Sequence, residues 1–434
     1  MKIFIIILVI GTCGSVHAQK ANKLIKEKNV ARIIKTLSAD DMMGRSARKP
    51  EQIEKATLFI ENEFKKIGLQ PLSGQTSFRQ EFIKEQISPI KLDVTLDGEK
   101  VAIENLILVS EKSVINMVGG LSIKTIEVDP QTTNQDQYFF DKAFALVRDT
   151  TSCIVVVGPE FQANFMEFKG YFKERFLNNR KSTKIFVLGK SKALTYSVKA
   201  TQKIESIKMA NVVGMLEGKS SPDDLVVFSG HYDHIGIQAP IEGDSIANGA
   251  DDDASGTTAV ITLAKYFKKL KNNNRTLIFT AFTAEEIGGY GSQYFSKQLD
   301  PDKVIAMFNI EMIGKPSKWG QNNAFITGFE RSDFGKILQK NLAGTLFQFH
   351  PDPYPEQNLF YRSDNATLAR LGVPAHSIST DEIDIDKFYH TVNDEMESLD
   401  MANITAAIRA IALSSKTIVS GADTPTRIDK ATVR

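Results

Sequence analysis

Histidines and carboxylates gather in three short segments between residues 225 and 289. The segments are SGHYDHIG (229–236), GADDDASG (249–256) and TAEEIGG (283–289). Imidazole nitrogens and carboxylate oxygens are the ligands that zinc takes in hydrolytic sites. Crowded carboxylates also repel one another unless a cation neutralises them. The pattern therefore favours a metal centre over a set of unrelated surface acids.

The first segment supplies a candidate ligand, His231. Residues 225–228 (LVVF) are an apolar run typical of a buried strand, which places His231 at the carboxyl end of that strand. Asp233 could accept the N–H of the ring nitrogen that does not bind metal, as the partners of metal-bound histidines often do. In isolation, a His-X-Asp sequence is more often a hydrogen-bonded loop histidine, so the remaining segments must support the metal interpretation.

The second segment places three acids, Asp251, Asp252 and Asp253, directly before a helix. A core-facing helix beginning near Ser255 is predicted because apolar residues recur at helical spacing, at Val260, Leu263, Ala264, Phe267 and Leu270. One acid would be enough to favour the positive end of a helix. Three adjacent acids are better explained by a metal ion.

The third segment follows a predicted buried strand at 275–282 and contains Glu285 and Glu286. Neighbouring side chains on an extended chain point in opposite directions, so the two glutamates can have different functions. One can bind metal while the other takes a proton from the metal-bound water. A lone Glu-Glu pair is usually solvated surface, but a pair at the end of a buried strand is a better site candidate.

Two downstream residues complete the set. Glu311 follows a predicted strand at 304–310, and His390 lies in an FYHT segment four residues before Asp394. Two histidines and three carboxylates, with one glutamate left as a base, suit a dinuclear zinc site whose ions lie roughly 3.5–4 Å apart.

The ordered motifs HYD, GADDDASG, AEE, NIEMIG, YRSD and YHTxxD resemble the co-catalytic zinc aminopeptidase family. This family includes secreted bacterial leucyl aminopeptidases and, more distantly, glutamate carboxypeptidases and glutaminyl cyclases. The resemblance covers most of the chain, from Gly44-Arg45 to the C-terminal helix. It implies an α/β fold, a three-layer α/β/α zinc-exopeptidase domain (phosphorylase/hydrolase-like) with a mixed, mostly parallel sheet and an inserted mixed or β-rich module.

The resemblance also implies particular roles. It implies two zinc ions bridged by Asp252, Glu285 as general base, Asp233 as the partner of His231, and a cis peptide between Asp252 and Asp253. The implied metal ligands are His231, Asp252, Glu286, Glu311 and His390.

The chain departs from the family pattern at two places. Glu311 stands where the family often has aspartate, and Asn365 stands where it has histidine. Some relatives place an oxyanion-stabilising tyrosine three residues before the serine of the YRSD segment. Phe360 holds that place here, which makes the neighbouring Tyr361 the weaker candidate for this role.

The chain divides into four predicted segments. Residues 1–18, with Lys2, an apolar run and a small-residue exit, form a predicted signal peptide, so the protein is expected to be periplasmic or secreted. A lipid anchor at Cys13 ranks second because Thr12 fits that motif poorly. Residues 19–95 form the helical start of the catalytic domain, 96–205 an inserted module that could be a degenerate protease-associated domain, and 206–434 the rest of the catalytic domain.

Composition excludes several classes of function. A net charge of +1 and 42% hydrophobic residues over 434 positions describe an ordinary globular protein, without a basic surface for nucleic acid and without a membrane span. Only Cys153 remains after the predicted signal peptide, so the mature chain has no internal disulfide. The oligomeric state is not predicted.

Several local predictions lie outside the metal set. Residues 332–342 are predicted as a helix capped by Ser332, 347–355 as a loop and 401–419 as the C-terminal helix. His350 is expected at the surface and His376 in the core, while His234 receives no role.

The predicted function is a zinc-dependent aminopeptidase that hydrolyses the N-terminal residues of peptides. The alternatives are a carboxypeptidase, a one-zinc glutaminyl cyclase and a non-catalytic binding module. A carboxypeptidase should offer arginines to the substrate's carboxylate, and only Arg362 and Arg370 lie near a site motif.

Overall fold

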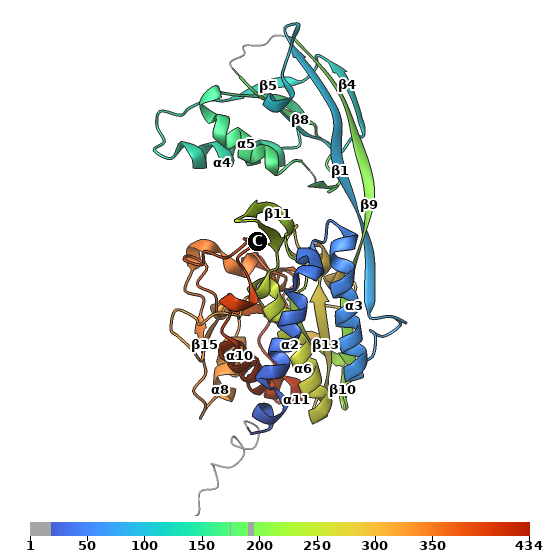
Figure 1. The fold of residues 1–434 in the computed structure, drawn as a ribbon, viewed down its shortest axis with the longest axis vertical. Helices are drawn as coiled ribbons and strands as arrows, with labels where there is room; N and C mark the ends of the chain where they lie inside the picture. Colours follow the sequence, from blue (N-terminus) through green and yellow to red (C-terminus); the bar gives the residue numbers. More distant parts are fainter. Residues whose placement is uncertain (1–18, 174, 190–194) are drawn as a thin grey trace, which may run out of the picture. The chain divides into compact units, whose positions relative to one another are not determined.

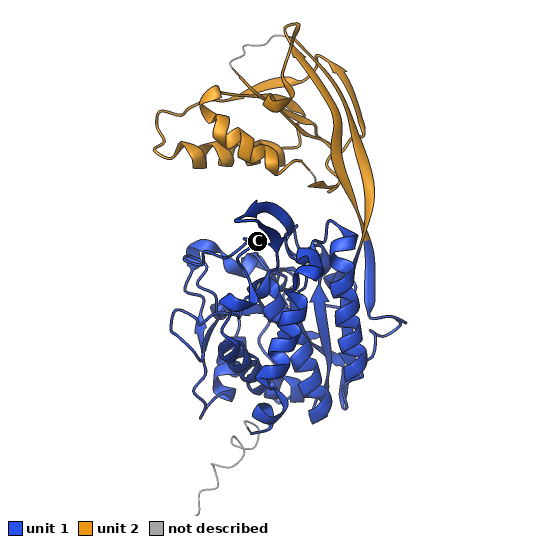
Figure 2. Ribbon diagram, in the orientation of Figure 1, with its two compact units in different colours: residues 1–82, 209–434 blue, residues 83–208 orange. Residues whose placement is uncertain are grey.

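The chain is divided into two compact units. The structure, a computed structural model, describes residues 19–173, 175–189 and 195–434. Unit 1 contains the chain up to Phe82 together with Met209–Arg434, and unit 2 is Ile83–Lys208 (Figure 2). The predicted signal peptide at 1–18, including Cys13, lies outside the described residues.

Four parallel strands form the centre of unit 1, in the order β17-β14-β10-β13. Their bounds are β10 Ser221–His231, β13 Arg275–Phe282, β14 Val304–Ile310 and β17 Ala375–Ser379. Every residue of β13 is buried, as expected for an apolar run covered on both faces. Because the strands are parallel, their carboxyl ends lie along the same edge of the sheet.

The sheet becomes mixed towards its edges. Beyond β17, β15 (Asn323–Ile326) runs antiparallel to it, and β16 (Gln348–Pro351) pairs parallel with β15. On the other side, β9 (Tyr196–Leu216) runs antiparallel to β13 and is followed by β1 (Arg79–Leu96). The predicted mixed sheet, parallel at its centre, is confirmed.

Alternating side chains of the central strands pack against two helical layers. Phe228 of β10 stacks on Phe279 of β13 and meets Phe267 of the helix α6 (Gly256–Leu270), while Phe308 of β14 packs against Phe334 of α8 (Phe334–Asn341). The neighbouring positions point to the opposite face, where α7 (Tyr290–Ser296) and α9 (Asn365–Ala369) contribute to the core; this second cluster includes Val227, Ile278, Met307, Phe295 and Leu368. The predicted α/β/α layering is therefore present.

The helices of unit 1 surround the sheet (Figure 1). They are α2 Glu27–Leu37, α3 Pro50–Ile67, α6 Gly256–Leu270, α7 Tyr290–Ser296, α8 Phe334–Asn341, α9 Asn365–Ala369, α10 Met401–Ser414 and α11 Lys416–Ser420. The helix α6 begins one residue after the predicted Ser255 and is preceded by a widened turn, η4 (Ala250–Ser255). A short hairpin of β11 (Gly236–Ile241) and β12 (Asp244–Ala247) lies between β10 and η4.

A buried arginine joins the N-terminal segment to the loops that follow β10 and β12. Arg45, in the short helix η1 (Asp40–Arg45), has no exposed surface and donates to the carbonyl oxygens of Leu37, Tyr232, Asn248 and Gly249 at 2.5–2.9 Å. Its neighbour Gly44 has φ +65°, and a side chain there would meet the backbone of residues 236 and 247 at 2.7 Å.

Unit 2 has a sheet and a helical layer of its own. The sheet order is β3-β8-β6-β5, with β3 Leu106–Val109, β5 Ser122–Ile126, β6 Cys153–Val157 and β8 Lys184–Leu188. The helices α4 (Gln135–Arg148) and α5 (Gln162–Gly170) share a phenylalanine-rich core with it. The strands β2 (Glu99–Lys100), β4 (Val114–Val118) and β7 (Arg175–Phe176) pair with β1 or β9. A protease-associated origin for this unit stays a prediction.

The structure corrects four local expectations. Residues 79–90, part of the segment predicted as the helical start of the catalytic domain, lie in the strand β1, whose buried and exposed side chains largely alternate. Residues 348–351 pair as β16 and are not loop. Asp333, not Ser332, is the N-cap of α8, although the Ser332 hydroxyl still accepts the Phe334 N–H at 3.3 Å. The C-terminal helix ends at Ser414, and α11 follows it.

Two further expectations concern hydropathy and histidines. None of the described helices is long and apolar enough to cross a bilayer. His376 is buried between the Ser332 hydroxyl and the Thr327 carbonyl, as predicted for a core residue. His350, predicted at the surface, is partly exposed; it stacks on Trp319 and contacts Asn323.

The Arg45 contacts predict a large stability loss in Arg45→Met. The substitution leaves four carbonyl oxygens without their donor inside the protein, so the free energy of unfolding should fall by about 3 kcal/mol. Lys49→Met, at an exposed position on the same segment, is the matched control and should change it by less than about 0.5 kcal/mol. Urea denaturation of both variants measures the difference, and equal losses would contradict the role given to Arg45.

Candidate metal centre

The carboxyl edge of the central sheet brings the candidate residues together. His231 is the last residue of β10, Glu285 and Glu286 follow β13, and Glu311 follows β14. Since β10 lies between β13 and β14, these side chains start from three adjacent strand ends. Asp252 reaches the same place from η4, and His390 from the segment after β17.

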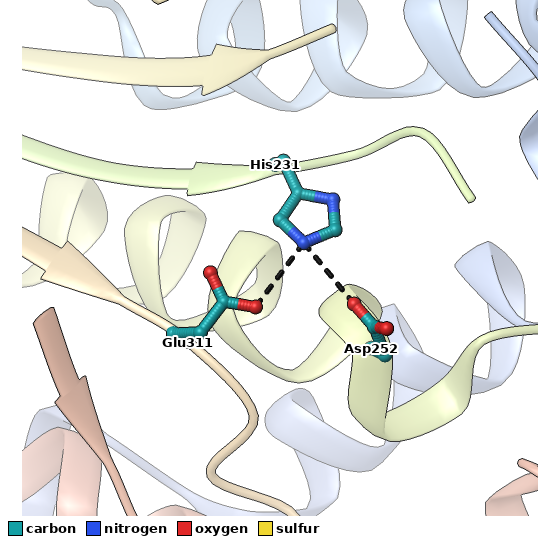
Figure 3. A group of neighbouring side chains, drawn as sticks. All are labelled: His231, Asp252 and Glu311. Atoms are coloured by element: carbon teal, nitrogen blue, oxygen red, sulfur yellow. Dashed lines mark hydrogen bonds and ion pairs between the residues drawn. The ribbon is translucent and has the colours of Figure 1, made fainter. Parts of the chain in front are cut away.

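The first group consists of His231, Asp252 and Glu311 (Figure 3). The Nε2 atom of His231 lies 3.1 Å from Asp252 Oδ1 and 3.2 Å from Glu311 Oε1, and both carboxylates point towards this nitrogen. The other ring nitrogen, Nδ1, lies 3.1 Å from the Asp233 carbonyl oxygen and can donate to it. That tautomer leaves the Nε2 lone pair directed at the two carboxylates, as a metal ligand requires.

The second group is built on the other oxygen of Asp252. His390 Nε2 lies 3.2 Å from Asp252 Oδ2 and 2.9 Å from Glu286 Oε2. His234, which received no role from the sequence, lies with Nδ1 2.8 Å from Glu286 Oε1 and 3.8 Å from Asp252 Oδ2. Asp252 thus divides its two oxygens between the groups, which is the arrangement that a bridging ligand needs.

The charges of this cluster depend on each other. Burial alone would raise the pKa of Asp252, but hydrogen bonds from His231 and His390 hold it well below the usual range. Burial likewise opposes the charged form of His390, yet the carboxylates of Asp252 and Glu286 raise its pKa to about 10. Burial raises the pKa of Glu285 well above normal, and repulsion from nearby carboxylates adds to this rise. The ionised forms of Asp252 and Glu286 therefore depend on the positive charge of the neighbouring histidines.

The donor atoms of each group suit a divalent cation. Each group combines imidazole nitrogen with carboxylate oxygen, and candidate ligand atoms within each group lie within 4.8 Å of one another. Such atoms are ligands for zinc and for related divalent ions. Cysteine does not contribute, since the one cysteine in the described residues, Cys153, is buried in unit 2.

The three consecutive acids point in different directions. Asp251 Oδ1 accepts the Gly314 N–H, and Asp253 accepts the backbone N–H groups of His231, Gly256 and Met312. Asp252 alone of the three faces the histidines. The peptide between Asp252 and Asp253 is cis, which confirms the prediction from the family resemblance.

Other polar side chains hold the candidate ligands in place. The Ser363 hydroxyl donates to Glu311 Oε2 at 2.6 Å and accepts from the Asn309 amide at 2.7 Å. The Asp394 carboxylate accepts the backbone N–H groups of Asp251 and Asp252. The YRSD and YHTxxD motifs therefore support the site through Ser363 and Asp394 as well as through His390.

Two predicted site residues have other contacts. The Asp233 carboxylate lies 3.7 Å from His231 Nδ1, which is too far for a hydrogen bond, and instead accepts the Glu285 N–H at 3.1 Å. Its carbonyl, not its carboxylate, orients His231. The Tyr361 hydroxyl contacts Arg331 at 3.2 Å and lies apart from the cluster. Tyr389 is the tyrosine in the pocket beside the cluster.

Backbone conformation at the site is unusual. Ala284, Met312 and His390 have φ between +46° and +61°, a region that side chains other than glycine seldom occupy. Each of these residues is a predicted ligand or lies within two positions of one. Left-handed residues at such sites are often retained for the geometry they impose, and no glycine signals them in the sequence.

A pocket adjoins the cluster. It encloses about 570 Å³ of empty space, part of it open to solvent. Asp252, Glu285, Glu286, Glu311 and His390 line one part of it. The rest of the lining is Met312, Phe325, Thr327, Leu359, Arg362, Ser363, Ser377, Ser379, Asp381, Ile383 and Tyr389.

Comparison with known proteins identifies relatives. The model of peptidase family M28 matches residues 211–414. A "probable zinc metalloprotease" of Pyrenophora tritici-repentis is 36% identical over 110 residues, 25% of each chain. Aminopeptidase Y of Saccharomyces cerevisiae is 25% identical over 207 residues, 45% of this chain and 36% of that one. The chain spans about a quarter of the length of the first of these relatives.

Solved structures show the same fold. An aminopeptidase from Aneurinibacillus sp. strain AM-1 aligns with a TM-score of 0.58 at 17% identity, covering 96% of this chain and 98% of that one. The zinc aminopeptidase BSAP from Bacillus subtilis aligns with a TM-score of 0.54 at 15% identity, covering 94% and 99%. At these identities the likeness shows a shared fold.

The contact between His234 and Glu286 predicts weaker metal retention in His234→Ala. Removing a group that fixes or supplements a ligand usually lowers metal affinity by about tenfold or more. Metal content measured by mass spectrometry after dialysis against graded chelator should show early loss in this variant. His350→Ala, a histidine outside the cluster, is the control. Equal retention in the two variants would leave His234 without a role at the site.

Chelator-treated protein should lose stability as pH rises. Burial first, and then neighbouring acids, raise the pKa of Asp233 and of Asp394 to about 8, whereas unfolded aspartate titrates near about 3.9. A raised folded-state pKa contributes stability that is complete below the unfolded pKa and is lost as pH rises to the folded one, by up to about 1.4 kcal/mol per pH unit for each group.

Calorimetry measures this effect. Between about pH 4 and pH 8, the melting temperature of the chelated protein should fall, and added Zn²⁺ should restore most of the loss at the upper end. A chelated protein whose melting temperature stays constant or rises over this range would contradict the charge balance described for the cluster.

Proposed function

We propose that the protein, whose residues 211–414 match the model of peptidase family M28, is a zinc-dependent aminopeptidase that removes N-terminal residues from peptides. The observation that carries the proposal is the position of Asp252, whose two carboxylate oxygens face separate histidine and carboxylate groups beside a pocket. The names of the relatives, which include zinc metalloproteases and aminopeptidases, support it.

Two zinc ions would be held by the two groups. His231, Asp252 and Glu311 would hold one, and Asp252, Glu286 and His390, next to His234, the other. When bound, such ions activate a water molecule as a nucleophile and polarise the scissile carbonyl. The protein's contribution is to hold these ligands in place, through the Asp233 carbonyl, Ser363 and Asp394.

Glu285 is the proposed general base. It lines the pocket, and its backbone N–H is fixed by the Asp233 carboxylate at 3.1 Å. Burial raises the pKa of its carboxyl group, which favours proton uptake near neutral pH. Its carboxylate oxygen would accept a proton from the attacking water and then donate it to the leaving amine of the cleaved peptide bond.

The charge of the pocket favours the amino end of a substrate. Five carboxylates line it, those of Asp252, Glu285, Glu286, Glu311 and Asp381. Bound zinc ions would neutralise the three carboxylates that hold them, so Glu285 and Asp381 remain to attract a free amine group.

The described arginines give little support to the carboxypeptidase alternative. Arg362 lines the pocket, but its guanidinium is hydrogen-bonded to Gln357 and Tyr389. Arg370 contacts the carbonyl of Arg434. The glutaminyl cyclase alternative needs one zinc ion, whereas the donor set has room for two.

A cellular location follows as a part of the proposal. We infer from residues 1–18 that the chain is exported to the periplasm or secreted, where peptides would be its substrates. A nucleic-acid partner is not expected from its charge.

The assignment of Glu285 as the base and of His390 as a metal ligand predicts different effects for substitutions at these two residues. Glu285→Gln should lower kcat by about a thousandfold while the zinc content stays near that of the unchanged protein. His390→Ala should lose zinc. Glu356→Gln, at an exposed position, is the charge-matched control and should do neither.

The experiment combines metal analysis with a panel of aminoacyl-arylamides and N-acetylated counterparts. Chelator-sensitive release from the free amino compounds alone would support an aminopeptidase. Release from C-terminal substrates only would favour the carboxypeptidase, and bound zinc without any hydrolysis would favour a binding module. A Glu285→Gln variant with full activity would refute the assigned base.

A further inference from the structure

Asp381 is a buried acid that the proposed catalytic steps leave unused. It lies two residues beyond the carboxyl end of β17, the strand next to β14 in the sheet. The side chain is 3% exposed, and as an ionised carboxylate it has no hydrogen-bond donor among the described residues; only its protonated form can pair, with Asp386. A buried carboxylate without a partner costs free energy, so an external partner is expected.

The surroundings of Asp381 carry more negative than positive charge. One carboxylate oxygen each of Asp251 and Asp386 lies within 4.8 Å of an oxygen of Asp381. Lys315 is the cation of this cluster, 2.5 Å from Asp386 and 3.5 Å from Asp251. Three acids therefore share one lysine, and Asp251 Oδ2 also lacks a hydrogen-bond partner in the described structure.

Electrostatics at Asp381 point the same way. Burial, followed by repulsion from Asp251 and Asp386, raises the pKa of Asp381 to about 9. A second positive charge placed against this carboxylate would offset both effects.

The pocket provides a path to Asp381. The same pocket is lined by Asp381 and by the metal-binding carboxylates, so a substrate held at the metal centre can extend a side chain into it. The lining also includes the apolar side chains of Met312, Phe325, Leu359 and Ile383. Such a lining suits a side chain with an apolar stem and a charged end, the character of lysine and arginine.

We propose that Asp381 binds the cationic side chain of the substrate's N-terminal residue, which makes the protein an aminopeptidase that favours lysine and arginine at that position. This inference rests on the proposed function and assigns its substrate class. Asp251 and Asp386 strengthen the negative potential, and Lys315, which is ion-paired with both, offsets part of it. No covalent step is added to the reaction.

The test compares lysyl- and arginyl-arylamides with the norleucyl derivative, which has an uncharged stem of similar length. For the zinc-loaded full chain, kcat/KM should favour the basic substrates by at least about tenfold. Asp381→Asn keeps the shape and removes the charge. It should lose this preference while its norleucyl activity remains. Asp384→Asn, an exposed aspartate of the same segment, is the matched control and should behave like the unchanged protein.

The outcomes separate this inference from the function on which it rests. Hydrolysis of none of the arylamides would refute the aminopeptidase proposal itself. Efficient norleucyl hydrolysis without a preference for lysine would overturn only the role of Asp381. A third metal ion per chain that disappears in Asp381→Asn would also overturn it, because the carboxylates would then hold an inorganic cation. If Asp381→Asn does not fold, inhibition of the unchanged protein decides, and free lysine should inhibit more strongly than norleucine.

Discussion

The repulsion between buried carboxylates is the constraint on which the rest of unit 1 depends. Asp252, Glu286 and Glu311 approach the same few ångströms of space, where little water is left to screen them. The parallel strands set this arrangement, because each strand end delivers its acid to one edge. Histidines and, in the proposed state, metal ions compensate for the charge. The surrounding hydrogen bonds from Ser363 and from the backbone then keep the acids from turning away.

The acid triplet shows how one short segment can serve several purposes. Asp251 faces Lys315 and the Gly314 N–H, Asp252 faces the histidines, and Asp253 receives backbone N–H groups from two strand ends and from the start of α6. Neighbouring residues can diverge in this way because the turn η4 is wider than a regular helix. The first and third acids therefore hold the loop that presents the second.

The sequence predicted most of the central sheet and of the histidine and carboxylate cluster, because both rest on local signals. Apolar runs gave β10, β13 and β14, and an acid or histidine directly after such a run has to lie at the sheet edge. His234 was missed because its approach to Glu286 depends on the path of the loop after β10. The tyrosine of the pocket was misplaced for a similar reason, since Tyr389 enters it beside a left-handed His390. Asp381 lies in the run STDEIDID, which is typical of solvated surface until β17 and its neighbours bury it.

The contacts of Arg45 also determine the order in which parts of the site can form while the chain is being synthesised. Arg45 and its acceptor Tyr232 are 187 residues apart, and all of unit 2 is translated between them. At the usual elongation rates of about 5–20 residues per second, the arginine leaves the ribosome roughly 10–40 s before its carbonyl partners. During that interval α2 and α3 lack the sheet that will cover them, so chaperones can bind their exposed apolar side chains. Unit 2, contiguous in sequence, can meanwhile form its own core.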